Sequence, residues 1–370
     1  MQSHHLTIGF VRRGFSSSGG AEAYLKRLAA GLVENGHTVR LYASTDWPPN
    51  EWTFGQLTRL EAHSAIAFAD EIEKLAPGSE CDVLMSFERI WRCDLYRAGD
   101  GVHRSWLERR EKSAGPFQKL SRFFNRKHSA TLALEESLFA KGGAARVIAN
   151  SRMVKDEIVR FYGFPAGKID VVYNGVPVGA LQRDAETRVR RREILGLGEK
   201  DVAVLFAGSG WERKGLRFAI DAIENAGNDL RLLVAGRGEE RKFRSERAQF
   251  LGVVEDMPAL YAAADIFLAP TLYDPFSNAC LEALAAGLPV ITTHANGFSE
   301  IIETGVHGTV VEDPRETGEI RDALVFWSDS ARREEACAGI RELAARFDIS
   351  ANVARTMEIL AQVAARAAST

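Results

Sequence analysis

A chain of 370 residues is too long for one ordinary hydrophobic core, so two domains are expected. Hydrophobic residues make up 46% and charged residues 26% of the chain, a balance typical of a folded soluble protein rather than a disordered one. The formal net charge of −3 at pH 7 gives no overall reason for nucleic-acid binding. Any attraction to an anionic surface must therefore come from a local patch.

The cysteines and the start of the chain favour the cytosol. The four cysteines form no C-x-x-C pair and no zinc-binding spacing, so we expect them to be reduced and mostly buried. Residues 1–5 are polar, and the apolar run at 6–11 is too short for a signal peptide. Since no apolar run is long enough to span a bilayer, we expect a cytoplasmic protein that is soluble or peripheral to a membrane.

In the first half of the chain, short apolar runs alternate with helical patterns, which predicts parallel sheets built from β-α-β units. The first strand leads into a loop that ends in Gly19-Gly20. A helix over 21–34 follows and stops at Asn35-Gly36, a typical helix end. Strands are expected at 6–11, 37–43, 82–87, 95–99, 146–150 and 169–173.

The second half repeats this alternation after a turn at Asn174–Pro177 and a charged helical segment at 183–193. The chain is therefore expected to be an α/β protein with two doubly wound, Rossmann-like domains facing each other across a cleft, and with ligands at the carboxyl ends of the strands. We place these domains at 1–174 and 175–346, and a last helical segment at 347–370 whose domain its periodicity does not decide. Strands are expected at 202–207, 230–235, 250–252, 266–269, 290–293 and 309–311, and helices at 216–223, 258–264, 279–286 and 349–368.

The stretch 208–215 lies between a predicted strand and a predicted helix. Its glycines allow close backbone approach, and Arg213 and Lys214 add two cations, so it is a candidate diphosphate site. Arg213 stands where a dinucleotide fingerprint needs glycine, and Gly215 stands where a Walker A loop needs serine or threonine. An ordinary solvated loop with a basic pair remains the alternative.

A second candidate stretch begins with Asp274 and ends with Glu282. The backbone amides of Ser277, Asn278 and Ala279 open a predicted helix and suit a phosphate group. The two carboxylates suit sugar hydroxyls, since an ionised carboxylate accepts several hydrogen bonds. The alternative is a loop acid beside a surface glutamate, although the apolar neighbours of Glu282 argue against it.

Several stretches together resemble the successive motifs of the family 4 retaining glycosyltransferases, which have the GT-B architecture of two Rossmann-like domains. The resemblance covers nearly the whole chain and is strongest in the second half. Within the family, the chain looks most like the bacterial enzymes that add the first glucose to the inner-core heptose of lipopolysaccharide. The family motifs are matched by Asn174–Val176, Arg213–Gly215, 274–290 and Asn296–Phe298, and the closer match is supported by Gly19-Gly20, 85–87, 96–100 and the basic segment that follows.

This resemblance implies roles for individual residues. Glu282 would bind the ribose of a UDP-sugar donor, and Asp274 would bind hydroxyls of the transferred sugar. Arg213 and Lys214 would hold the diphosphate and stabilise the charge of the leaving group. Asp274 stands where the family usually has glutamate, so the identity of the sugar stays open.

The resemblance also implies three backbone contacts. Gly19 and Gly20 would approach the donor phosphate or the acceptor, and the segment that ends at Val254 would read the nucleobase. No D-x-D triplet occurs, and the cationic role falls to Arg213 and Lys214. We therefore expect neither a metal nor any other cofactor, with the UDP-sugar as the donor substrate.

Asp100 and His103 are the candidates for the reacting centre, since both follow the predicted strand 95–99 at its carboxyl end. Either side chain could orient the sugar or take a proton from the acceptor hydroxyl. Asp100-Gly101 is also an ordinary turn dipeptide, and His103 could merely cap a loop.

The segment 104–128 carries eight Lys and Arg residues against two Glu, interleaved with aromatic residues. Such a composition suits an interfacial helix on an anionic leaflet, with Arg109, Arg110, Arg122 and Arg126 as contacts. This would place the protein on the inner face of the cytoplasmic membrane. The alternative is a helix that packs its aromatic residues inside the first domain, and no nucleic-acid recognition motif accompanies the segment.

Our hypothesis from the sequence is a retaining hexosyltransferase that moves glucose from a UDP-sugar to a glycolipid or oligosaccharide acceptor, such as the lipopolysaccharide inner core. One alternative is a nucleotide-sugar 2-epimerase of the same architecture, which would need no acceptor. A second is a non-catalytic sugar-binding protein, against which the Arg213-Lys214 pair argues.

Overall fold

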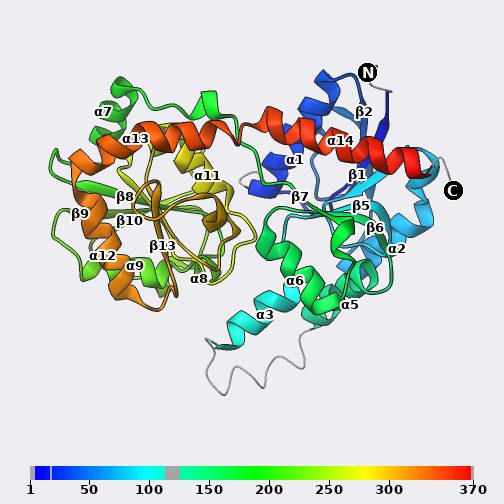
Figure 1. The fold of residues 1–370 in the computed structure, drawn as a ribbon, viewed down its shortest axis with the longest axis horizontal. Helices are drawn as coiled ribbons and strands as arrows, with labels where there is room; N and C mark the ends of the chain where they lie inside the picture. Colours follow the sequence, from blue (N-terminus) through cyan, green and yellow to red (C-terminus); the bar gives the residue numbers. More distant parts are fainter. Residues whose placement is uncertain (1–4, 17–18, 113–125, 368–370) are drawn as a thin grey trace. The chain divides into compact units, whose positions relative to one another are not determined.

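The computed structural model describes residues 5–16, 19–112 and 126–367 (Figure 1). Contacts between residues divide the chain into two compact units. The first comprises Met1–Asn174 with Ser350–Thr370, and the second comprises Gly175–Ile349. No helix in the described part of the chain is both long and apolar enough to cross a bilayer.

A seven-stranded parallel sheet forms the centre of the first unit, in the order β3-β2-β1-β4-β5-β6-β7. Strands β1 and β4 are almost entirely buried apolar runs, as expected for parallel strands covered on both faces. The edge strand β3, with the sequence GQLTRL, is largely exposed and was not predicted. The strands are β1 (Thr7–Val11), β2 (Thr38–Ser44), β3 (Gly55–Leu60), β4 (Val83–Ser86), β5 (Cys93–Ala98), β6 (Ala144–Ala149) and β7 (Ile169–Val171).

Helices lie on both faces of this sheet (Figure 1). The Ser64 hydroxyl caps α2 by accepting a hydrogen bond from the Ala67 amide. The Ser151 hydroxyl caps α6 in the same way, with the Val154 amide as donor. Helices α2, α3 and α6 all contact α5. The helices are α1 (Gly20–Glu34), α2 (Ala65–Leu75), α3 (His103–Lys112), α5 (Arg126–Phe139) and α6 (Arg152–Tyr162).

The final helix, α14 (Ile349–Ala367), packs on the first unit. Its Asn352 accepts a hydrogen bond from the Tyr24 hydroxyl at 2.7 Å and donates one to the Tyr173 carbonyl. Gly31 of α1 leaves room for this helix, because a Cβ atom there would lie 2.6 Å from a methyl group of Val353. These contacts decide the question that the periodicity of the helix left open.

A six-stranded parallel sheet forms the centre of the second unit, in the doubly wound order β10-β9-β8-β11-β12-β13. The predicted α/β class with two such sheets is confirmed. The strands are β8 (Val202–Ala207), β9 (Leu230–Ala235), β10 (Ala248–Gly252), β11 (Ile266–Ala269), β12 (Val290–Thr293) and β13 (Gly308–Val311). The helices are α7 (Ala185–Ile194), α8 (Trp211–Lys214), α9 (Leu216–Glu224), α10 (Met257–Ala263), α11 (Asn278–Ala285), α12 (Thr317–Ser328) and α13 (Ser330–Ala345).

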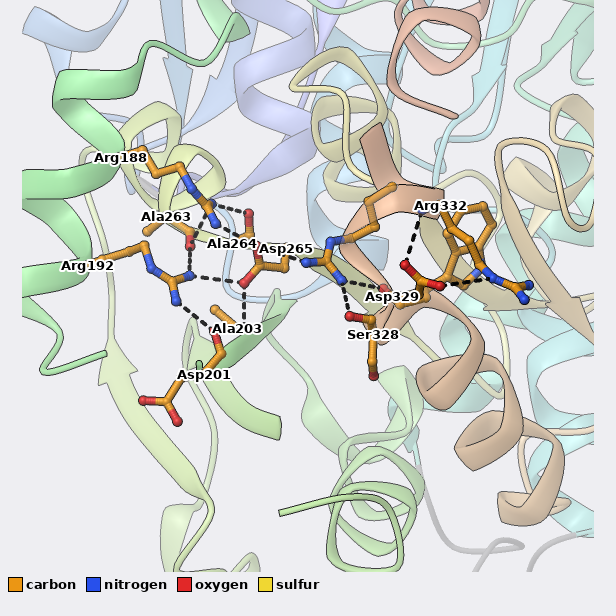
Figure 2. A network of polar contacts seen from close by, with 12 residues as sticks. Arg188, Arg192, Asp201, Ala203, Ala263, Ala264, Asp265, Ser328, Asp329 and Arg332 are labelled. Carbon is orange, nitrogen blue, oxygen red and sulfur yellow. Dashed lines mark hydrogen bonds and ion pairs between the residues drawn. The ribbon is translucent and has the colours of Figure 1, made fainter. Parts of the chain in front are cut away.

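A buried carboxylate ties α7 to the amino ends of β8 and β11 (Figure 2). Asp265 is 6% exposed and accepts hydrogen bonds from Arg188 at 2.6 Å, Arg192 at 3.0 Å and the Ala203 amide at 2.8 Å. Burial alone would raise the pKa of Asp265, but Arg188 and the Ala203 amide hold it below its usual value. Because this Asp265 clasp lies at the strand ends opposite the ligand-binding edge, we assign it a structural role.

Candidate functional site

The loop after β8 approaches the end of β11 closely. Gly208, Gly210 and Gly215 all have positive φ angles, of 139°, 73° and 81°. A Cβ atom at Gly215 would lie 1.8 Å from the Pro270 carbonyl oxygen, so only glycine fits there. The loop contains the single-turn helix α8, and Gly215 then precedes α9.

Arg213 and Lys214 both reach from α8 to the loop that follows β11. Arg213 donates from Nη1 to the Tyr273 carbonyl at 2.7 Å, and Lys214 Nζ lies 2.9 Å from Asp274 Oδ2. The Lys214 stem crosses Gly208, where a Cβ atom would lie 3.0 Å from Lys214 Cε. The carboxyl ends of two neighbouring strands therefore hold two cations in fixed positions.

Asp274 is 5% exposed and forms a buried ion pair with Lys214. Burial by itself would raise the pKa of this carboxyl, but Lys214 and Arg213 lower it below its usual range. The Phe276 backbone amide also lowers it. Asp274 is therefore ionised at neutral pH and bound to the cation that the sequence assigned to the diphosphate.

The amino end of α11 is built by side chains from two loops. The Ser277 hydroxyl accepts a hydrogen bond from the Cys280 amide at 3.4 Å and so caps the helix, in which Asn278 and Ala279 are the first residues. The Ser277 amide donates to Asn296 Oδ1 at 3.2 Å. The expectation that this amide is available to a phosphate is therefore wrong, because the buried Asn296 already occupies it.

Glu282 lies one turn further along α11 and is half-buried. Its Oε2 accepts a hydrogen bond from the hydroxyl of Tyr261, a fully buried residue of α10, at 3.0 Å. Val254 lies just beyond β10, at the same carboxyl edge of the sheet, and is half-buried. The second unit thus carries all of its predicted donor-site residues on loops or helices that follow its strands.

Arg12 organises the carboxyl edge of the first sheet. It follows β1 directly and donates to Glu22 of α1 at 3.0 Å, to the Phe87 carbonyl at 3.2 Å and to Asp100 Oδ2 at 2.9 Å. Burial alone would lower the pKa of Arg12, but Asp100, Glu88 and Glu22 raise it above its usual value. The structure therefore places the predicted Asp100 in an ion pair that also reaches α1.

The predicted glycine pair opens α1. Gly19 is the N-cap of this helix and Gly20 its first residue. A Cβ atom at Gly19 would lie 1.8 Å from Glu22 Oε2, the carboxylate that binds Arg12. Glycine at this position therefore has a packing reason in addition to any approach by a ligand.

His103 begins α3 and is held by Glu135 of α5. Its backbone amide donates to Glu135 Oε1 at 2.6 Å, and its Nε2 lies 2.9 Å from Nδ1 of His128. Glu135 is fully buried and also pairs with Arg89 at 2.9 Å. A carboxylate at the amino end of α3 is favourable both as a cap and for the helix dipole.

The four arginines predicted to contact a membrane differ in their placement. Arg109 forms an ion pair with the buried Glu157 of α6 at 3.1 Å, whereas Arg110 is exposed on α3. Arg122 and the Arg126 side chain lie outside the described residues, as does most of the segment after α3.

Three residues of these sites were not predicted: Arg12, Glu135 and Tyr261. Asn296 belonged to a family-like stretch, but no role was predicted for it. Glu135 could have been found, since it lies in the apolar helix sequence TLALEESLF, the same signal that singled out Glu282. Tyr261 and Arg12 had no such signal, because a buried tyrosine or a loop arginine is common in any domain. Among the described residues, no three His, Cys, Asp or Glu side chains are placed to hold a metal ion.

Comparison with known proteins identifies the class. Residues 201–327 match the model of the glycosyl transferases group 1, and residues 97–179 match that of glycosyltransferase family 4. The chain is 30% identical to a probable transglycosylase of Burkholderia thailandensis, over 98% of both chains. It is 23% identical to the lipopolysaccharide glucosyltransferase WaaG of Escherichia coli, over 88% of this chain and 93% of WaaG.

Solved structures agree with this class. A WaaG structure superposes with a TM-score of 0.81 at 21% identity, covering 95% of this chain and 99% of that one. Anabaena HepE in complex with UDP and glucose gives 0.76 at 19% identity, covering 97% of this chain and 100% of that one. The fold is therefore GT-B, and the protein is a glycosyltransferase. The chain belongs to glycosyltransferase family 4.

Proposed function

We propose that the protein transfers a hexose, with glucose as the expected sugar, from a UDP-sugar to a glycolipid acceptor with retention of anomeric configuration. The observation that carries this proposal is the pair Arg213 and Lys214, fixed at the carboxyl ends of β8 and β11 beside Asp274. Two cations next to the start of a helix suit a diphosphate leaving group. Support for UDP and glucose comes from the likeness to WaaG and to HepE, whose structure contains both.

In this proposal the two cations act on the bond that breaks. The acceptor hydroxyl forms a new bond to the anomeric carbon while the bond to the diphosphate oxygen breaks, and Arg213 and Lys214 stabilise the charge that develops there. Glu282 binds the ribose. The carboxylate of Asp274 is buried against the ammonium group of Lys214. We therefore propose that Asp274 orients Lys214, in place of the direct contact with the sugar that the sequence led us to expect.

The carboxyl edge of the first sheet is proposed for the acceptor. Asp100, oriented by Arg12, or His103, whose backbone is held by Glu135 and whose imidazole lies beside His128, takes the proton of the attacking hydroxyl. The loop of Gly19 and Gly20 is proposed to approach a donor phosphate or the acceptor. No metal is required in this scheme, because the cationic role belongs to side chains of the second unit.

The test is nucleotide release by the purified protein. We expect UDP release from UDP-glucose that depends on an inner-core heptose oligosaccharide, and a product whose α-linkage is visible by NMR. Lys214→Met should weaken UDP binding by at least about tenfold, since a charge-assisted contact to phosphate is lost. Lys242→Met is the matched control, because this lysine of the same unit is exposed and pairs with Glu239 at 2.8 Å.

Two outcomes would contradict the proposal. Formation of an epimer from a UDP-sugar without acceptor would show the alternative epimerase. If the protein bound neither UDP-sugars nor GDP-sugars, the proposed donor site would be refuted.

We also propose that the segment 104–128 binds an anionic membrane surface, which would bring the enzyme to its glycolipid. Because Arg109 is engaged with Glu157, the informative variant neutralises Arg110, Arg122 and Arg126 and leaves Arg109 in place. It should sediment less with vesicles containing phosphatidylglycerol while still hydrolysing donor. Unchanged sedimentation would show that these arginines do not bind lipid.

A further inference from the structure

The hydroxyl of Tyr261 lies beside the carboxylate of Glu282 in the interior of the second unit. Tyr261 is 0% exposed, and its ring packs against Phe267 of β11 with centroids 6.1 Å apart. The hydroxyl lies 3.0 Å from Glu282 Oε2 and 3.4 Å from the Ala279 carbonyl oxygen. A phenol has one proton to donate. We assign this hydrogen bond to the Glu282 carboxylate, which is both the nearer acceptor and an ionisable group.

We infer that Tyr261 is a positioning residue for ribose recognition, an assignment that rests on the proposed function of Glu282. A glutamate side chain loses considerable rotamer freedom when a ligand fixes it. Here the hydroxyl comes from a buried ring on another helix, α10, and so sets the orientation of the carboxylate before a nucleotide arrives. Such preorganisation strengthens binding, because the carboxylate loses less conformational entropy when the nucleotide binds.

The ligand class follows from the proposed function of Glu282. A carboxylate held in one orientation recognises a group that presents hydroxyl donors at a fixed spacing, and the ribose of a nucleoside diphosphate does so. The contribution of Tyr261 should therefore pass through the ribose hydroxyls and through no other part of the nucleotide.

The experiment is calorimetric titration of the full chain with UDP and with 2′,3′-dideoxy-UDP. Tyr261→Phe keeps the ring and its packing and removes only the hydroxyl. We expect the affinity for UDP to fall by about fivefold, less than for the loss of a direct hydrogen bond to a charged group, because the hydroxyl contacts the carboxylate and not the nucleotide. The affinity for the dideoxy nucleotide should stay the same, because that ligand has no ribose hydroxyl for Glu282 to bind.

A double-variant comparison separates positioning from general damage. If Tyr261 acts through Glu282, then Tyr261→Phe should cause no further loss of UDP affinity in a Glu282→Ala background. Tyr42→Phe is the control, since this buried tyrosine of β2 lies 3.5 Å from a carboxylate oxygen of Glu80 in the first unit. It should leave both affinities unchanged.

Three results would overturn the assignment. The first is equal affinity of the wild type and Tyr261→Phe for UDP. The second is an equal loss for both nucleotides, which would indicate damage to the fold. Binding of neither nucleotide by the wild type would instead refute the proposed function, and the assignment with it.

Discussion

The Asp265 clasp allows a quantitative prediction about stability. Replacing Asp265 with asparagine removes the negative charge while keeping the shape of the side chain. Two guanidinium groups and one backbone amide then face a neutral group at distances of 2.6–3.0 Å, and the Arg333 guanidinium does so at 3.9 Å (Figure 2). The partners differ in hydration, since the Arg192 side chain is 12% exposed and that of Arg188 is 32% exposed.

The magnitude follows from this environment. Breaking a buried ion pair costs about 3–5 kcal/mol, because the remaining charge is left without compensation. The asparagine side chain still has one oxygen that accepts hydrogen bonds, and water partly hydrates Arg188. The lower end of this energy range therefore applies. We expect Asp265→Asn to lower the free energy of unfolding of the second unit by about 3 kcal/mol at neutral pH.

The same residue predicts how stability depends on pH. The folded pKa of Asp265 lies below its unfolded value of about 3.9, so the contribution of the clasp is present above that pH. It is lost as the pH falls through the folded pKa. The stability difference between wild type and Asp265→Asn should therefore narrow below about pH 4.

Urea denaturation followed by circular dichroism measures both effects. Asp322→Asn is the control, because its pair with Arg321 is exposed, at 44% and 70%, and should change stability by less than about 1 kcal/mol. A loss of less than about 1 kcal/mol for Asp265→Asn, or a difference that stays constant into acid, would refute the reasoning.

Three further predictions concern the sites. Asp274→Asn should change the affinities for UDP and UDP-glucose by the same factor in calorimetry, because the carboxylate binds Lys214; a change for UDP-glucose alone would show direct sugar contact. Asp100→Asn should lower kcat by about a hundredfold in steady-state assays and leave KM for the donor unchanged, whereas an unchanged kcat would favour His103. Gly215→Ala should lower the thermal midpoint more than Gly196→Ala, since both have positive φ but a Cβ atom meets the Pro270 carbonyl only at the first; equal shifts would contradict this.

Most of the sheet strands could be predicted because parallel strands are buried on both faces and appear as uninterrupted apolar runs. This held for β8, β9 and β11, whose predicted and observed bounds agree. It failed for β3, because an edge strand with one neighbour is largely exposed and needs no apolar run. The position of α14 was also open, since its apolar face would suit either unit. Contacts such as that between Gly31 and Val353 decide it.

The candidate sites were predicted as groups of residues, but not as contacts. The sequence placed Arg213, Lys214 and Asp274 after two strands, and parallel topology brings the ends of β8 and β11 to one edge. It did not show that Lys214 and Asp274 bind each other, because the number of residues between two positions does not fix the distance between their side chains. For the same reason it offered the Ser277 amide to a phosphate, although Asn296, from a third loop, occupies it.

The sequence by itself determined the α/β class, the doubly wound halves, the likeness to family 4 and the positions after the strands where charged residues gather. These features depend on local periodicity and on motifs read along the chain. Only the tertiary structure decided which charges neutralise each other, which amides are occupied and which residues, such as Arg12, Glu135 and Tyr261, hold the candidate site residues in place. Such pairings join residues from different elements, and their strength comes from shared burial, which exists only once the chain has folded.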